Sequence, residues 1–268
     1  MELPDECIAD ILCRTTPLDV ARISVVSKNF CSVIDSDTIW DHFLPSDYRS
    51  IISQSFSMDS VPSKKALYLA FSDHPIIIDQ GKKSFQLDRK SGKKCYMLSA
   101  RALNISNSDD ERYCRWVTIP ESRFEEVAML KDALQFYISG TINTIDLSSN
   151  TQYAVFLVFK LITTHGFYYD PVLLLMRIFG GPICTKGACL DMRLEAMSTY
   201  NMPQYPNMRS DGLLEIEMGE FFSSGPKDGE VEMGVMILKS VSWRGNFYLE
   251  GIEVRPKVSC PIRNIRQA

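Results

Sequence analysis

Residues 153–159 read Tyr-Ala-Val-Phe-Leu-Val-Phe, an unbroken apolar run. A strand that is apolar on both faces is typical of the interior of a β-sandwich, where both faces are covered. The run is too short to cross a membrane, because Lys160 follows it and a spanning helix needs about 18 apolar residues. It therefore predicts the centre of a β-sandwich.

The segments around this strand predict further strands. Residues 84–98 read as a hairpin around Arg89-Lys90-Ser91-Gly92, which has the composition of a turn. Further strand patterns lie at residues 134–139, 172–179, 213–218, 231–238 and 247–254. Long helical patterns do not occur between them, which argues against a βαβ nucleotide-binding fold. We expect a jelly-roll-like β-sandwich over residues 76–257.

The N-terminal region has the period of helices instead. Asp5 and Glu6 follow Pro4 in a first helical turn, and apolar residues then recur at helical spacing. A second helix is expected to begin after Thr16, which can cap it, and to continue to Ile34. Ser36 can cap a third, shorter helix. These patterns predict a small all-α module over residues 1–48.

The region between the modules is rich in serine. Residues 49–62 predict a loose connector, and Ser63 can cap a spacer helix that ends before His74-Pro75. The expected order is thus the helical module, a linker with its spacer helix at 49–75, the sandwich at 76–257 and a tail at 258–268. The fold class is α+β in two modules. So small a helical module buries only a modest core by itself, which predicts that it packs against a partner or a neighbouring domain.

Charge and composition exclude several classes of protein. The first 48 residues hold three basic and nine acidic side chains, a net charge of −6, so the remainder carries +2 of the total of −4. This charge provides no general attraction to nucleic acid or to anionic membranes. The N-terminus lacks a secretory pattern, so we expect a protein of the cytoplasm and nucleus. Its eight cysteines are then expected to be reduced thiols, mostly small buried hydrophobes.

The residues that catalysis would need are scattered. Each of the three histidines lies in a different region, and no Gly-x-Ser-x-Gly motif occurs. Cys184 and Cys189 have no further ligands to complete a zinc site, so we expect no metal and no cofactor. Glu230 and Glu232 would share one strand face, either as an acceptor pair for sugar hydroxyls or cations or, as we favour from periodicity, as a solvated face. We expect a protein that is not an enzyme.

The N-terminal residues resemble an F-box. The resemblance covers residues 2–45 and depends on an ordered set of short motifs: Leu3-Pro4, Ile8, Ile11-Leu12, Pro17-Leu18-Asp19, Val25-Val26-Ser27-Lys28-Asn29-Phe30 and Trp40. No single motif is specific, but the set at these spacings is.

Residues 92–256 resemble the phloem protein 2 family of plant lectins. The matching segments are Leu98–Leu103, Tyr153–Lys160, Arg209–Gly212, Leu214–Phe222, Asp228–Met233 and Gly251–Pro256. Together the two resemblances identify the chain as similar to plant F-box proteins of the phloem protein 2 B group. They imply that the sandwich is a lectin-type domain.

The F-box resemblance implies a role in ubiquitination. An F-box binds the Skp-type adaptor and, through it, the cullin of an SCF ubiquitin ligase, while the second domain selects the target protein. The residues expected to contact the adaptor are Leu3, Pro4, Ile8, Leu12, Leu18, Val25 and Phe30, because such interfaces depend on a few apolar anchors. The alternative is that the apolar residues of these helices form the core of the F-box itself. For Ile11, Val26, Val33 and Trp40 this alternative is at least as good.

The lectin resemblance implies a sugar site that this sequence has partly lost. The family stacks the sugar on two tryptophans, but Asn107 and Cys114 stand at those positions and Trp116 aligns with a structural tryptophan. Glu230 matches the family's sugar-binding glutamate, while Ile237 replaces a second acidic residue. Trp116 and Glu230 remain the candidate carbohydrate-binding residues. We therefore expect recognition of a target protein, with a lectin for glycoproteins as the alternative.

Overall fold

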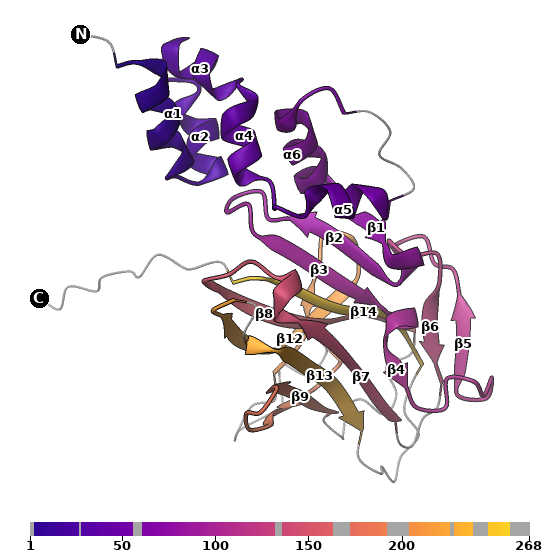
Figure 1. Cartoon of the computed structure of the whole chain (residues 1–268). Helices are drawn as coiled ribbons and strands as arrows, with labels where there is room; N and C mark the ends of the chain where they lie inside the picture. The colour runs from indigo at the N-terminus through magenta and orange to yellow at the C-terminus, as the bar shows by residue number, and fades with distance from the viewer. Residues whose placement is uncertain are drawn as a thin grey trace, which may run out of the picture.

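The computed structural model describes residues 3–26, 28–55, 61–131, 136–162, 172–191, 204–225, 228–237 and 246–257. A group of short helices at the N-terminus stands on one edge of a two-sheet β domain, as Figure 1 shows. This arrangement agrees with the predicted class of a small helical module followed by a sandwich.

Six helices precede the first strand among the described residues. They are α1 (Asp5–Cys13), α2 (Pro17–Ile23), α3 (Lys28–Ile34), α4 (Asp37–Phe43), α5 (Tyr48–Ser53) and α6 (Lys64–Asp73). The predicted caps at Thr16 and Ser63 are present, since their side chains accept hydrogen bonds from the backbone N–H groups of Asp19 and Ala66. Ser36 precedes α4 but makes no such bond.

Two details of the helical region differ from the sequence-based expectation. The single helix expected from residue 17 to residue 34 is two helices, and Val25 and Val26 lie exposed where it breaks. β-Branched residues are weak helix formers, which makes this a natural point of interruption. The serine-rich connector is not wholly loose either, because α5 forms within it and buries Ile51.

The described strands form two antiparallel sheets. They are β1 (Ile76–Ile78), β2 (Lys83–Leu87), β3 (Lys94–Ser99), β4 (Asn104–Ile105), β5 (Cys114–Val117), β6 (Val127–Leu130), β7 (Phe136–Asn143), β8 (Thr151–Leu161), β9 (Val172–Ile178), β10 (Cys184–Ala188), β11 (Asn207–Met208), β12 (Leu214–Ser223), β13 (Glu230–Ile237) and β14 (Phe247–Pro256). Short 3-10 turns lie at 79–81, 100–102 and 144–146.

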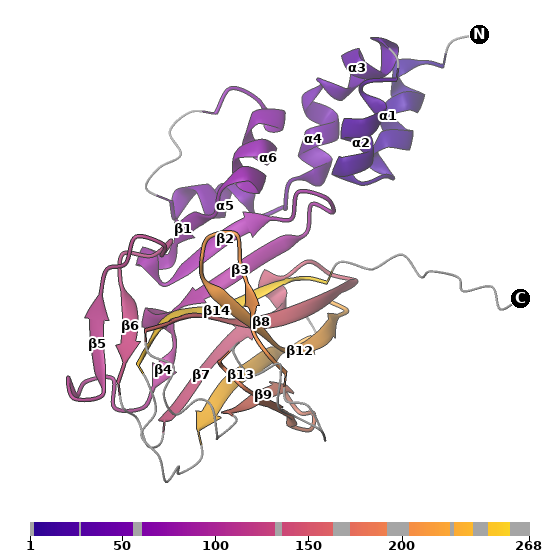
Figure 2. The ribbon, with the colours of Figure 1, turned by 180° about the vertical axis from the view of Figure 1, so that it is seen from behind.

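The larger sheet has nine strands in the order β1-β2-β3-β14-β8-β12-β11, and β6 adds the β5–β6 hairpin beside β14. The apolar run at residues 153–159 lies in β8, which pairs with β14 and β12 and is buried on both faces, as predicted. The smaller sheet has the order β10-β9-β13-β7-β4. Figure 2 shows β13, β7 and β9 of this sheet below β8 and β12 of the larger one.

The hydrophobic core lies between the sheets and continues into the helices. Inward side chains of β13, such as Val231, Met233 and Val235, are fully buried and alternate with outward ones. The same cluster of contacts extends without a break to Ile8, Leu12 and other apolar residues of the helical module. The two modules therefore share one core.

Tyr68 of α6 is the centre of the joint between the modules. Its ring centroid lies 5.2 Å from that of Trp40 in α4 and 6.4 Å from that of Phe43. The side chain is 1% exposed, and burial raises the pKa of its hydroxyl to about 12. An ion pair of 2.8 Å between Lys94 and Asp47 adds a polar link beside this contact. The Tyr68 hydroxyl also lies 3.5 Å from two backbone carbonyl oxygens of the turn between β2 and β3, so α6 connects α4 to the sandwich.

Candidate functional site

The helical module exposes large apolar side chains. Leu3 is 57% exposed, Ile11 48%, Val25 86% and Val26 74%. These four residues, which we call the apolar stripe, belong to the N-terminal segment, to α1 and to the break between α2 and α3. Figure 1 shows α1 on the side of the helical module away from α6. A small domain that leaves such residues in water has a surface suited to a protein partner.

The structure separates the predicted adaptor contacts into three groups. Leu3, Pro4 and Val25 are exposed, and Leu18 and Phe30 are half-buried. Ile8 and Leu12, however, are 3% and 0% exposed, because α1 turns them toward α3 and α4. We therefore remove these two residues from the predicted docking surface.

The structure divides the four residues for which a place in the F-box core was at least as good an interpretation. Val33 and Trp40 are indeed buried, and the Trp40 indole N–H donates to the backbone carbonyl of Ile34 at 2.6 Å. Ile11 and Val26 are not buried but belong to the apolar stripe. The helical period places Ile8, Ile11 and Leu12 on one broad face, and only the packing of the neighbouring helices decides which of them is covered.

The two candidate sugar-binding residues lie on different sheets. Trp116 is in β5, which joins the nine-stranded sheet through β6 and β14. Glu230 is exposed at the start of β13, in the middle of the five-stranded sheet. Figure 1 shows β5 and β13 well apart. The structure thus does not bring these residues together into one site.

The surroundings of Trp116 are those of a structural residue. The guanidinium carbon of Arg101 lies 3.5 Å from the centroid of the indole ring, and Arg101 in turn pairs with Glu126 at 2.5 Å. Asn107 is exposed in the turn after β4, whereas Cys114 is buried. Neither residue offers an aromatic surface on which a sugar could stack.

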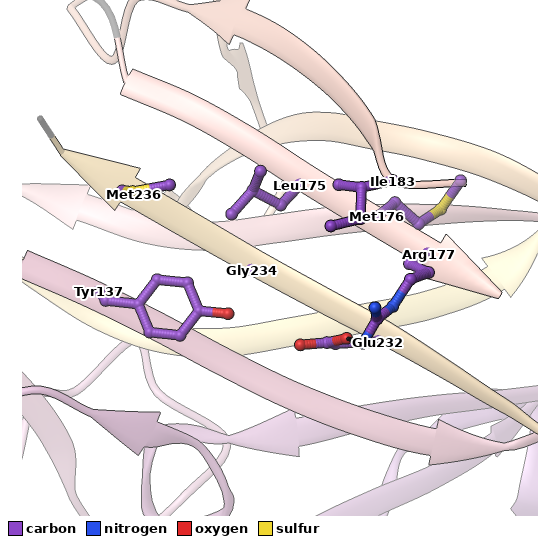
Figure 3. A pocket seen from close by; sticks show the side chains of 8 residues that line it. All are labelled: Tyr137, Leu175, Met176, Arg177, Ile183, Glu232, Gly234 and Met236. Atoms are coloured by element: carbon purple, nitrogen blue, oxygen red, sulfur yellow. Dashed lines mark hydrogen bonds and ion pairs between the residues drawn. The ribbon is translucent and has the colours of Figure 1, made fainter. Parts of the chain in front are cut away.

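The outer face of the five-stranded sheet contains a pocket of about 320 Å³. Its lining comes from three neighbouring strands and from the β9–β10 turn: Tyr137, Leu175, Met176, Arg177, Ile183, Glu232, Gly234 and Met236. Figure 3 shows Tyr137 and Met236 at one end and the Arg177–Glu232 pair at the other, with Gly234 between them. Sequence reasoning singled out Glu232 but missed the other residues, because the pairing of β7, β9 and β13 cannot be read from alternation alone.

The remaining chemical groups do not cluster. No group of three His, Cys, Asp or Glu side chains in the described part of the chain is placed to hold a metal ion. The described cysteines are thiols rather than disulfides, but the expectation of burial fails for most of them, since among them only Cys114 and Cys189 are buried while Cys7, Cys31 and Cys184 are exposed. None of the helices that the structure describes has the length and hydropathy needed to cross a bilayer.

Comparison with known proteins identifies both modules. Residues 1–42 match the F-box domain, and residues 93–256 match the phloem protein 2 family. The Arabidopsis thaliana protein PP2-B12 is 41% identical over 257 residues, which cover 96% of this chain and 98% of that protein. The F-box protein PP2-B10 of the same plant is 38% identical, covering 94% of this chain and 92% of its own length.

Solved structures show a more distant likeness. A family 35 carbohydrate-binding module from Clostridium thermocellum has a TM-score of 0.35 and 13% sequence identity, covering 60% of this chain and 96% of the module.

Proposed function

Because the chain belongs to the phloem protein 2 family and carries an F-box domain at its N-terminus, we propose that it is the substrate receptor of an SCF-type ubiquitin ligase. The F-box binds the Skp-type adaptor and, through it, the cullin, and the sandwich binds the target protein in the cytoplasm or nucleus. The chain itself performs no covalent chemistry in this scheme. The apolar stripe is the observation that carries the proposal.

The energetics of the apolar stripe support a protein partner. Burying one side chain of valine, leucine or isoleucine is favourable by about 1.5 to 3 kcal/mol. Val25 and Val26 are more than two-thirds exposed, so a partner that covers them gains most of this energy. Interfaces depend on a few such anchors surrounded by polar residues, and α1 also exposes Asp5, Glu6 and Asp10.

The joint supports the second half of the proposal. A substrate receptor has to hold its target at a defined place relative to the ligase, which a loose connection between the modules would prevent. Tyr68 of α6 packs against Trp40 and Phe43 of α4, its hydroxyl contacts the turn between β2 and β3, and one hydrophobic core runs through the helices and the sandwich. Binding of the adaptor to the helices then also sets the position of the target-binding face of the sandwich.

The glycan-binding alternative has less support. Stacking on aromatic residues and hydrogen bonds to a carboxylate have to act on the same sugar ring. Trp116 and Glu230 lie on separate sheets, and Arg101 covers the indole ring. We therefore favour a protein target.

The test is the affinity for the adaptor. We expect the double substitution Ile11→Asp and Val25→Asp in the full chain to weaken binding of a purified Skp-type adaptor by about a hundredfold or more, since each anchor contributes about 1.4 kcal/mol or more. Both residues are exposed, so the variant should fold. Isothermal titration calorimetry measures the change.

The matched control places the same charge on the sandwich. Phe222 is 52% exposed on β12, and Phe222→Asp should leave adaptor binding unchanged. Leu12→Asp is not a suitable test, because Leu12 is fully buried and its loss would unfold the module. Unchanged adaptor affinity in the Ile11/Val25 variant would refute the proposed docking surface.

A further inference from the structure

The pocket on the five-stranded sheet exists because Gly234 of β13 has no side chain to fill it, so the backbone of this strand forms its floor. Gly234 pairs with Leu175 of β9 on one side and with Ser139 of β7 on the other. A Cβ at Gly234 would lie 3.1 Å from the carbonyl oxygen of Ile138 and 3.5 Å from the ring of Tyr137. Any larger residue would therefore fill the hollow.

The hollow lies in a cross-strand row in which every residue except Leu175 has a small or medium-sized side chain or none. Strand pairing sets Thr185, Leu175, Gly234, Ser139 and Asn104 side by side on β10, β9, β13, β7 and β4. The row is flanked by pairs of long side chains, which are Met236 with Tyr137 on one side and Arg177 with Glu232 on the other. The result is a hollow at Gly234 between these two flanking pairs.

The chemistry of the lining is apolar and electrically neutral. The side chains of Leu175, Met236 and Ile183 and the ring of Tyr137 present carbon and sulfur surfaces. Arg177 and Glu232 neutralise each other through a contact of 2.5 Å, so the pocket has no net charge to offer a ligand. Both members of the pair are about 40% exposed, and so they form the wet rim of the pocket rather than its floor.

Apolar surface continues beyond the pocket to the turn between β9 and β10. Phe179 is 77% exposed and Ile183 is 58% exposed at the two ends of this turn. A concave anchor site beside exposed aromatic and aliphatic residues is typical of a protein-binding surface. Methionine adds a flexible wall that can adapt to side chains of different shape.

We propose that this pocket binds a large uncharged apolar side chain, such as leucine, methionine or phenylalanine, from an extended segment of the target protein. The inference rests on the proposed function and adds to it the kind of side chain by which the receptor recognises its target. The Arg177–Glu232 pair at the rim of the pocket can donate to carbonyl groups of the segment and accept from its N–H groups.

A sugar is a poorer occupant of the same pocket. Each sugar hydroxyl that leaves water needs a hydrogen-bonding partner, or it costs free energy. The lining provides such partners only at the ion pair and at the Tyr137 hydroxyl, while Leu175, Ile183 and Met236 provide none. An apolar side chain gains from the same surfaces.

The experiment selects random peptides displayed on phage against the full chain bound to its adaptor, and then measures selected peptides by fluorescence anisotropy. We expect the peptides to share one large apolar residue whose change to alanine weakens binding about tenfold or more. Leu175→Glu, which places a charge on the pocket wall, should weaken binding by a similar factor. Ile183→Glu is a second variant, because so exposed a residue cannot be needed for folding.

Asn104→Glu is the matched control. Asn104 occupies the same cross-strand row at the opposite edge of the sheet and does not line the pocket, so this variant should bind the peptides like the wild type. Peptides that bind equally well to the Leu175→Glu variant would refute the inference, as would a selection that yields no binders. Binding on a glycan array that is lost in the same variant would refute it in favour of a sugar.

The adaptor affinity of each variant separates this inference from the proposed function. Normal adaptor binding without peptide binding overturns only the pocket assignment. Peptide binding at the pocket by a chain that fails to bind the adaptor overturns the ligase role and leaves the pocket in place.

Discussion

Changing Gly251 to alanine is expected to reduce the free energy of unfolding by about 3 kcal/mol or more, which lowers the melting temperature by roughly 6 to 12 °C in a protein of this size. Gly251 lies in β14 opposite Ser99 of β3, near the middle of the nine-stranded sheet. A Cβ at this position would lie 1.9 Å from the carbonyl oxygen of Leu98 and 3.3 Å from the Cα of Ser99. The clash is with backbone, so relief requires the strands to move apart.

A second glycine provides the control for this experiment. Gly187 lies in the edge strand β10, and a Cβ there would meet nothing within 4 Å. Gly187→Ala should change the free energy of unfolding by less than about 0.5 kcal/mol. Thermal unfolding of the full chain, followed by circular dichroism, compares the two. If both variants melt with the wild type, the close approach of β14 to β3 is refuted.

Changing Glu253 to glutamine is expected to cost about 3 kcal/mol at neutral pH, because it removes the most buried of the carboxylates that compensate Arg209 and Arg255, which then share Glu215. The Glu253 carboxylate is 8% exposed and lies 2.7 Å from Arg209, 2.7 Å from Arg255 and 3.5 Å from Arg123. Burial alone would raise the pKa of Glu253, but the three guanidinium groups outweigh it and hold the pKa below its ordinary value.

The pH dependence of this effect has a defined sign. Glu253 is protonated more easily in the unfolded chain, where the pKa is about 4.3, than in the folded one. The stability that its charge provides is therefore complete above that pH and is lost as the pH falls through the lower, folded pKa. The difference in melting temperature between wild type and Glu253→Gln should be constant near neutral pH and shrink in acid.

Glu250, on the same strand, is the matched control, because its pKa is shifted in the opposite direction. One carboxylate oxygen accepts from the backbone N–H of Arg123 at 3.0 Å, and the other is buried without a partner among the described residues. Burial raises the pKa of Glu250, so its folded form loses stability as the pH rises through that value.

Glu250→Gln should therefore be at least as stable as the wild type at neutral pH. This advantage should disappear toward about pH 4, because Glu250 becomes protonated there and is then uncharged like glutamine. Equal losses of stability in the Glu250 and Glu253 variants would contradict this account of the cluster. Urea unfolding across a pH series measures both.

The sequence by itself determined where most strands and helices lie. The apolar run at 153–159 became β8, the hairpin at 84–98 became β2 and β3, and Thr16 and Ser63 cap helices as expected. These features are local, since alternation, capping and turn composition act within a few residues of one another. The F-box and lectin-type character were also readable, because they depend on ordered motifs within single modules.

Only the tertiary structure decided which of those residues form surfaces. The sequence of α1 does not distinguish Ile8 from Ile11, since both belong to its apolar face. In the structure, α3 and α4 cover Ile8 and leave Ile11 exposed to water. Trp116 and Glu230 are separated because β5 and β6 pair with β14 on the larger sheet. The pocket at Gly234 exists only through the register of β9, β13 and β7. Register and helix packing join residues that are distant in the chain, and a pattern read along one segment does not contain them.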